Sequence, residues 1–169
     1  MSAAARIRPA TIDDLGAIMA IERASFLTDA WSEAMMAEEL RSPHGAYVVV
    51  EQAGRIIGYA GLRALAGARD GDIQTIALSA DARGRGQGRA LLRHLIDEAA
   101  RRRVRELFLE VRADNPVARR LYASEGFHEI GVRPRYYQPD DVDAVIMRLD
   151  VRAWDAARDA RPAEAGACT

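Results

Sequence analysis

The stretch Ala82-Arg83-Gly84-Arg85-Gly86-Gln87-Gly88-Arg89-Ala90-Leu91-Leu92 decides how the chain is organised. A β-rich run over residues 73–78 leads into it, and a helical pattern over about residues 89–102 follows. A glycine-rich turn between a strand and a helix points backbone N–H groups into one concavity, at the positive end of the helix dipole. Glycine allows positive φ and close approach of a ligand, and the arginines add positive charge. The turn therefore predicts an anion site suited to a diphosphate, with a solvated arginine- and glycine-rich loop as the alternative.

Two common diphosphate-binding motifs are absent from this stretch. The dinucleotide fingerprint G-x-G-x-x-G fails, because its third glycine position holds Arg89 when counted from Gly84 and Leu91 when counted from Gly86. A Walker loop requires a lysine, and all 24 basic residues of this chain are arginines. The pattern therefore excludes a nucleoside triphosphate held by a P-loop.

Length and composition indicate one soluble globular domain. The chain has 169 residues, a size typical of one domain, and we expect that domain to span residues 1–152. The net charge of −1 argues against general nucleic-acid binding, and no apolar run is long enough to span a membrane. The first residues lack a signal-peptide core, and the single cysteine, Cys168, supports neither a disulfide framework nor a zinc site. We expect a cytoplasmic protein.

Apolar periodicity and turn residues predict the element order β-α-α-β-β-β-α-β-α-β-β. This order indicates an α/β fold, a mixed sheet with helices on both faces and a parallel pair of strands around the helix after the glycine turn. Residues 134–139 read as a loop between the last two strands, and residues 153–169 as a mobile tail without apolar periodicity. The expected strands cover residues 6–8, 46–51, 56–62, 72–78, 107–112, 127–132 and 144–149, and the expected helices cover residues 12–26, 33–41, 89–102 and 116–125.

Two residues near the middle of the chain are candidates for chemistry. Strand alternation places Glu110 on one face with Phe108 and Arg112, in a strand that we expect to be central and mostly buried. A buried carboxylate needs a partner or a catalytic role, and an ion pair with Arg112 or with a cross-strand arginine is the alternative. Tyr122 lies on the apolar face of the next helix, where a core aromatic is the alternative. The three histidines have no metal-ligand spacing, so we predict no metal site.

An ordered set of short segments resembles a known family. The turn matches an acetyl-coenzyme A signature through Arg83, Gly86 and Gly88, and the segments downstream make the match specific. From residue 73 to residue 149 the chain resembles the ribosomal-protein-alanine N-acetyltransferases (RimI type) of the GNAT superfamily. The resemblance implies the GNAT acyl-coenzyme A N-acyltransferase fold, a central mixed sheet flanked by about four helices. The carrying segments are residues 83–92, 109–115, 121–127, 135–137 and 143–147, together with 21–22 and 31–33.

The resemblance also implies which residues act. Acetyl transfer from acetyl-coenzyme A needs a neutral amine, and a peptide α-amine has a pKa near 8, so a base must remove its proton. By similarity Glu110 is that base, and Tyr122 is the acid that protonates the leaving thiolate. The implied acetyl-coenzyme A contacts are the backbone of Ile76, Ala77 and Leu78, the turn residues Arg83, Gly84, Arg85, Gly86, Gln87, Gly88 and Arg89, and Asn115. The implied substrate contacts are Glu22, Trp31, Arg135, Tyr136 and Tyr137.

Three functions follow from these observations. The leading one is acetylation of a protein N-terminal α-amine, with the N-terminal alanine of a small-subunit ribosomal protein as the family's usual target. The second keeps the fold and acetyl-coenzyme A but acetylates a small amine, such as a polyamine or an aminoglycoside. The third is a non-catalytic acyl-coenzyme A-binding module, against which Glu110 and Tyr122 both count. We expect a monomer whose partner is a protein N-terminus, without direct nucleic-acid or membrane binding.

Overall fold

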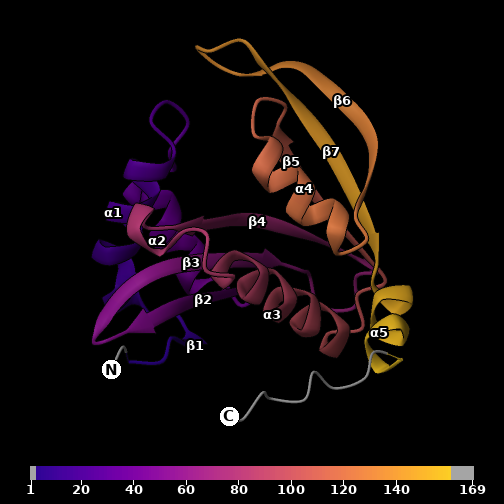
Figure 1. Ribbon diagram of the computed structural model, residues 1–169, viewed down its shortest axis with the longest axis horizontal. Helices are drawn as coiled ribbons and strands as arrows, with labels where there is room; N and C mark the ends of the chain where they lie inside the picture. The colour runs from indigo at the N-terminus through magenta and orange to yellow at the C-terminus, as the bar shows by residue number, and fades with distance from the viewer. Residues whose placement is uncertain (1–2, 161–169) are drawn as a thin grey trace.

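The computed structural model describes residues 3–160 of the chain. Within this range the chain forms seven strands and five α-helices, and no helix is long and apolar enough to cross a membrane (Figure 1). In chain order they are β1 (Arg6–Pro9), α1 (Leu15–Ser25), α2 (Glu33–Arg41), β2 (Gly45–Gln52), β3 (Arg55–Arg63), β4 (Asp70–Leu78), α3 (Gln87–Arg101), β5 (Glu106–Arg112), α4 (Pro116–Ser124), β6 (His128–Tyr137), β7 (Val142–Asp150) and α5 (Val151–Asp159).

All seven strands belong to one sheet. Their order is β1-β2-β3-β4-β5-β7-β6, and every neighbouring pair is antiparallel except β4 and β5. The parallel pair arises because α3 is a crossover helix. It returns the chain to the end of the sheet at which β4 begins, and β5 starts from that same end. The predicted mixed sheet, the parallel pair and the order of elements up to β7 are confirmed.

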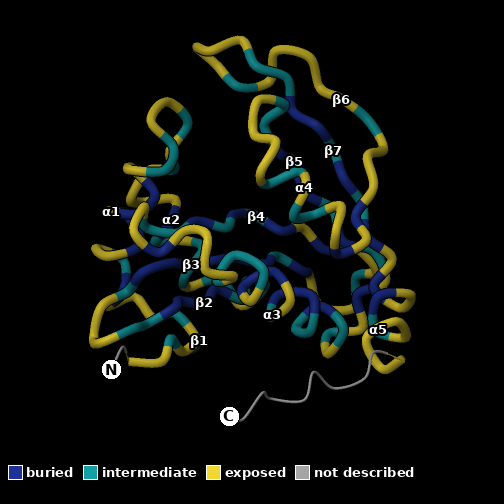
Figure 2. The backbone as a smooth tube through the Cα atoms, viewed as in Figure 1, coloured by how far each residue is buried: buried dark blue, intermediate teal, exposed yellow. Residues whose placement is uncertain are grey.

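Helices cover both faces of the sheet, and strand alternation divides the core between them. Tyr47 and Val49 of β2 pack with Ile18 and Met36, which belong to α1 and α2. The intervening Val48 and Val50 pack on the opposite face with apolar residues of α3. Figure 2 shows the central strands, such as β3, as buried and much of the helix surface around them as exposed. A fully buried leucine or isoleucine contributes roughly 1.5–3 kcal/mol, so the buried face of α3 fixes the helix that follows the glycine turn.

Local contacts explain where three helices begin. The Ser32 hydroxyl accepts a hydrogen bond from the Met35 N–H at 3.2 Å at the start of α2, and Asn115 caps α4 with Pro116 at the first helical position. Helix α3 begins at Gln87, two residues before the predicted start, because Gly86 takes the left-handed conformation with φ of 81° and caps it.

The predicted loop over residues 134–139 is wrong for its first part. Strand β6 continues to Tyr137, and β7 returns from Val142. The register between the two strands is irregular from Arg133 to Tyr137, and β6 lies at the edge of the sheet, where Pro134 is tolerated. The sequence of this irregular strand segment therefore resembles that of a loop.

The predicted tail from residue 153 is also wrong in part, because residues Val151–Asp159 form α5. The Asp150 carboxylate accepts a hydrogen bond from the Ala153 N–H at 3.0 Å and starts the helix. Val151 and Trp154 are buried and hold it against the core. The rest of the predicted tail, residues 161–169, lies outside the described residues.

Candidate active site

A cleft lies between β4 and β5, where the two strands separate. Their parallel pairing covers only Asp70 to Asp72 of β4 and Glu106 to Phe108 of β5. Beyond these pairs both strands line a cleft of about 850 Å³. The side of β4 that faces the cleft there pairs with no other strand among the described residues, so its backbone groups can pair with an extended ligand.

The cleft brings the two predicted catalytic residues together. Glu110 of β5 and Tyr122 of α4 both line it. The predicted burial of Glu110 is wrong, because the separation of β4 from β5 leaves its side chain 30% exposed. Its carboxylate forms an ion pair with Arg133 of β6 at 3.1 Å, the cross-strand arginine that the sequence allowed as an alternative.

Tyr122 is suited to donate a proton at neutral pH. Its ring packs edge-on against Phe127, with the ring centroids 5.9 Å apart. Burial raises the pKa of Tyr122 to about 12, so the phenol keeps its proton over the physiological range. A protonated phenol beside the cleft can donate a hydrogen bond to sulfur as negative charge develops on the leaving thiolate.

Two further tyrosines border the cleft from β6. Tyr136 and Tyr137 pack edge to face, with ring centroids 5.2 Å apart. The negative charge of Glu110, and a hydrogen bond to it, raise the pKa of Tyr136. Burial raises the pKa of Tyr137, with Glu110 and Asp29 adding to the effect. Both hydroxyls therefore remain neutral donors near the predicted base.

The opposite border of the cleft comes from α1 and the segment between α1 and α2. Glu22 is only 1% exposed, and its Oε1 accepts a hydrogen bond from the Trp31 N–H at 2.9 Å. Its Oε2 has no hydrogen-bond partner among the described residues. Burial raises the pKa of Glu22, and the nearby charge of Asp29 raises it further. Glu22 and Trp31 both line the cleft.

Two cleft carboxylates were missed from the sequence. Asp29 lies in the segment between α1 and α2, and Asp72 lies on β4. Burial raises the pKa of Asp72, and the charge of Glu110 raises it further. Strand alternation could have found Asp72, since it shares a face with Gln74 and Ile76.

The excess of negative charge in the cleft favours a cationic ligand. Among the described residues that line it, four carboxylates face two guanidinium groups. The carboxylates belong to Glu22, Asp29, Asp72 and Glu110, and the guanidinium groups to Arg112 and Arg133. An excess of carboxylates concentrates cations such as protonated amines in a cleft.

The glycine turn has the open geometry that an anion cradle needs. Gly84 and Gly86 have φ of 76° and 81°, and a side chain added at either would meet no atom within 4 Å. The Arg83 guanidinium donates from Nε to the Leu78 carbonyl at 3.3 Å, which ties the turn to the end of β4. Gln87 and Gly88 form the first turn of α3, where backbone N–H groups have no helical partner. Arg85 is exposed beside them.

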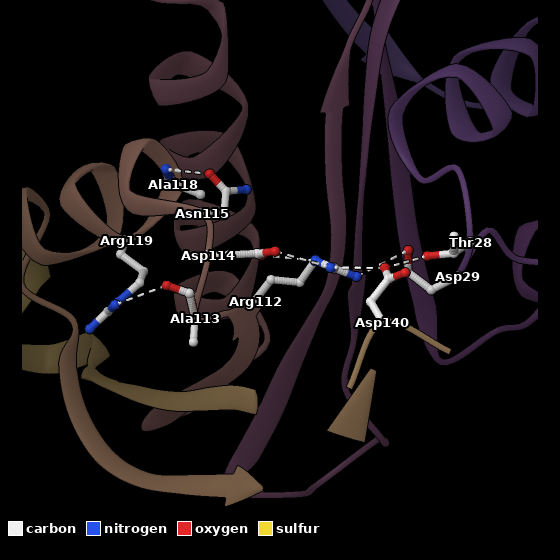
Figure 3. Close-up of polar contacts among 9 residues, drawn as sticks. All are labelled: Thr28, Asp29, Arg112, Ala113, Asp114, Asn115, Ala118, Arg119 and Asp140. Atoms are coloured by element: carbon white, nitrogen blue, oxygen red, sulfur yellow. Dashed lines mark hydrogen bonds and ion pairs between the residues drawn. The ribbon is translucent and has the colours of Figure 1, made fainter. Parts of the chain in front are cut away.

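The other predicted acetyl-coenzyme A contacts are divided between the cleft and the core. Ile76 and Asn115 line the cleft, whereas Ala77 is buried against α1 and the Leu78 side chain lies against Gly58. The Asn115 side-chain oxygen accepts a hydrogen bond from the Ala118 N–H at 3.2 Å, as Figure 3 shows, and its amide nitrogen is the group that can donate to a ligand.

Two of the predicted contacts, Arg89 and Arg135, bind other side chains of this chain in this structure. The Arg89 guanidinium donates to the carboxylate of Glu125 and to the Ser124 hydroxyl at the end of α4. The Arg135 side chain is 77% exposed, pairs with Asp141 at 3.7 Å and does not line the cleft. No group of three or more His, Cys, Asp or Glu side chains in residues 3–160 is arranged to hold a metal ion.

The fold and the cleft are those of an acyl-coenzyme A-dependent acetyltransferase, and comparison with known proteins shows the family. Residues 15–127 match the acetyltransferase (GNAT) family. The chain therefore belongs to this family and is an acetyl-coenzyme A-dependent N-acetyltransferase. Family membership thus favours an enzyme over the non-catalytic binding module.

Relatives place the chain near one branch of the family. It is 42% identical over 124 residues to the N-alpha-acetyltransferase RimI of Mycobacterium tuberculosis, a match that covers 72% of this chain and 77% of that protein. It is 50% identical over 78 residues to the ribosomal protein bS18-alanine N-acetyltransferase of Escherichia coli K12, which covers 45% of this chain and 53% of that enzyme. The crystal structure of the ribosomal-protein-S18-alanine N-acetyltransferase from Escherichia coli aligns with a TM-score of 0.80 at 35% identity, covering 88% of this chain and 94% of that one.

Proposed function

We propose that this chain transfers the acetyl group of acetyl-coenzyme A to the N-terminal α-amine of a protein, with the N-terminal alanine of a small-subunit ribosomal protein as the substrate. One observation carries this proposal. Glu110 and Tyr122 line a single cleft whose acceptor side is acidic and whose β4 edge is free to pair. The similarity to ribosomal-protein-alanine N-acetyltransferases supports the choice of acceptor.

Acetyl-coenzyme A fits the residues present in two places. The N–H groups of Gly86, Gln87 and Gly88 would hold the diphosphate at the start of α3. The free edge of β4 around Ile76 would pair with the pantetheine arm, and Asn115 would donate from its side-chain amide. When bound, acetyl-coenzyme A supplies a thioester whose carbonyl carbon accepts the amine.

The residues of the cleft then handle two protons. The acidic lining draws in the α-ammonium group, and the Glu110 carboxylate accepts its proton directly or through water. The amine nitrogen forms a bond to the carbonyl carbon, and the carbon–sulfur bond breaks. Tyr122 gives its proton to the leaving sulfur, and the second proton of the nitrogen returns to Tyr122 directly or through water, so the products are an acetylated amine and free coenzyme A. The incoming N-terminus would lie between the two borders of the cleft, one formed by Glu22 and Trp31 and the other by Tyr136 and Tyr137.

A small cationic amine is the second candidate acceptor, because the same excess of carboxylates would attract a polyamine. Thiol release from acetyl-coenzyme A distinguishes the two. The acceptors are peptides with different first residues, the same peptides blocked at the α-amine, and polyamines. Turnover only with free α-amines, fastest with alanine first, supports the proposal. Turnover with polyamines alone contradicts it and keeps the family assignment.

A further inference from the structure

Arg112 stands at the end of β5, two residues beyond Glu110 and on the same face. Its guanidinium binds the Asp114 carboxylate through two hydrogen bonds of 3.0 and 3.1 Å. It also donates to Asp140 at 3.0 Å and forms a longer ion pair of 3.8 Å with Asp29. Figure 3 shows the guanidinium between Asp114 on one side and Asp29 and Asp140 on the other. One cation therefore holds three carboxylates.

These three carboxylates belong to three different connections of the chain. Asp29 lies between α1 and α2, Asp114 between β5 and α4, and Asp140 between β6 and β7. Asp140 also accepts a hydrogen bond from the Thr28 hydroxyl at 2.8 Å, so the α1–α2 and β6–β7 connections touch each other directly. The Arg112 guanidinium in addition covers the Tyr137 ring, 5.1 Å from its centroid.

The geometry requires an arginine. A guanidinium presents five donors in one plane, so it can bind one carboxylate through two bonds and still reach others, whereas a lysine ammonium is a point charge. The Arg112 side chain is 20% exposed, and those of Asp29, Asp140 and Asp114 are 22%, 35% and 54% exposed, so the guanidinium is partly shielded from water and its partners less so. Partial burial makes such bonds stronger than those of an exposed surface pair.

The two linked connections carry the two borders of the cleft. Trp31 lies in the first together with Asp29, and the second begins directly after Tyr137, the last residue of β6. We propose that Arg112, Asp140 and Thr28 form a clasp that positions these borders for the acceptor, an inference that rests on the proposed function for the identity of that acceptor. Arg112 is in this view a positioning residue, which acts through the α1–α2 and β6–β7 connections.

Two substitutions test the clasp without touching a predicted catalytic residue. Thr28→Val removes the hydroxyl that donates to Asp140 and keeps the shape of the side chain. Asp140→Asn removes the charge that faces Arg112. The KM for an alanine-first peptide should rise about threefold for the first, which loses one hydrogen bond to the carboxylate, and about tenfold for the second, which loses the negative charge that both Thr28 and Arg112 bind. The value of kcat and the Kd for acetyl-coenzyme A should stay within about twofold of the wild type.

A neighbouring residue gives a matched control. Asp141→Asn removes the same charge from the same connection, keeps an oxygen for the Gln138 side chain and does not contact Arg112. Its KM for the peptide should equal that of the wild type. An unchanged KM in both Thr28→Val and Asp140→Asn would overturn the clasp, and so would a Kd for acetyl-coenzyme A that rises in step with the peptide KM. Arg112→Lys should resemble Asp140→Asn, because lysine cannot bridge the three carboxylates.

Hydrogen–deuterium exchange tests the clasp independently of acetyl transfer. Asp140→Asn should speed exchange of the backbone amides of residues 26–32, across the cleft from the substitution, and Asp141→Asn should not. Unchanged exchange in residues 26–32 would overturn the clasp. If exchange changes as expected and the wild type acetylates no peptide, the clasp holds and the proposed acceptor fails.

Discussion

The buried carboxylate of Glu125 gives the sharpest stability prediction. Its side chain is 1% exposed and accepts hydrogen bonds from Arg89, from Arg93 at 3.0 Å and from the Trp154 indole at 3.3 Å. Both arginines bind one carboxylate oxygen and the indole binds the other. In Glu125→Gln only one oxygen remains, so either the arginines or the indole must face an amide NH₂ group.

The cost can be worked out from these contacts. A buried donor left without a partner costs about 1–3 kcal/mol, and the arginine bonds also lose the contribution of the negative charge. The arginines are 39% and 45% exposed and can turn to water, which keeps the total near 2–4 kcal/mol. For a chain of this size each kcal/mol lowers Tm by about 2–4 °C, so a loss of about 3 kcal/mol lowers Tm by about 6–12 °C.

The stability lost in Glu125→Gln should become smaller as the pH falls. Burial acts to raise the pKa of Glu125, but hydrogen bonds from Arg89 and Trp154 and the charge of Arg93 outweigh it, and the pKa in the folded protein is lowered. The stabilisation is therefore complete above the unfolded pKa of about 4.3 and is lost as pH falls through the lower folded value. The difference between wild type and Glu125→Gln should be constant from about pH 8 to pH 5.5 and shrink in acid.

Urea unfolding followed by far-ultraviolet circular dichroism measures this difference at each pH. Glu129→Gln is the matched control, because Glu129 is 49% exposed in its pair with Arg119 and should change stability by less than about 0.5 kcal/mol. A difference below about 0.5 kcal/mol for Glu125→Gln at pH 7, or one that grows in acid, would refute the reasoning.

Three further predictions concern the cleft and the turn. Glu110→Gln should lower kcat about 10²- to 10⁴-fold, with an unchanged Kd for acetyl-coenzyme A measured by calorimetry. Full activity of this variant from pH 7 to pH 9 would exclude Glu110 as the general base. Tyr122→Phe should also lower kcat at unchanged Kd, and an unaltered kcat would remove Tyr122 as the acid. Gly86→Val places a β-branched residue at φ of 81°, so coenzyme A affinity should fall more than about tenfold in a folded protein. Wild-type affinity would show that the turn does not hold the diphosphate.

The features that the sequence predicts well depend on neighbouring residues. The positive φ of Gly84 and Gly86, the cap at Asn115 and the alternation around Glu110 are local properties, and each appears as expected. The cleft gathers the predicted pair Glu110 and Tyr122 because β5 and α4 follow each other directly, separated by a short capped turn. Local signals therefore predicted two residues that line one cleft, and their catalytic roles stay a prediction.

The features that the sequence could not predict depend on distant partners. The exposure of Glu110 follows from the separation of β4 and β5. The contact of Arg89 with Glu125 joins residues 36 positions apart, and a guanidinium near a glycine turn reads equally well as a phosphate ligand. Helix α5 has only two buried apolar residues, so its sequence of alanines, arginines and aspartates resembles that of a tail. The contact that holds the helix, the hydrogen bond from Trp154 to Glu125, joins residues far apart in the chain. Arg112 likewise joins carboxylates that are far apart in the chain.

The central claim is that the acceptor is an N-terminal α-amine, and one product analysis tests it most directly. The substrate is a peptide that begins with alanine and carries a single lysine near its other end, incubated with the enzyme and acetyl-coenzyme A. Fragmentation by mass spectrometry then locates the acetyl group. The account predicts that the acetyl group is found only on the alanine nitrogen. Acetylation of the lysine side chain, or no transfer to this peptide while a polyamine is acetylated, would contradict it.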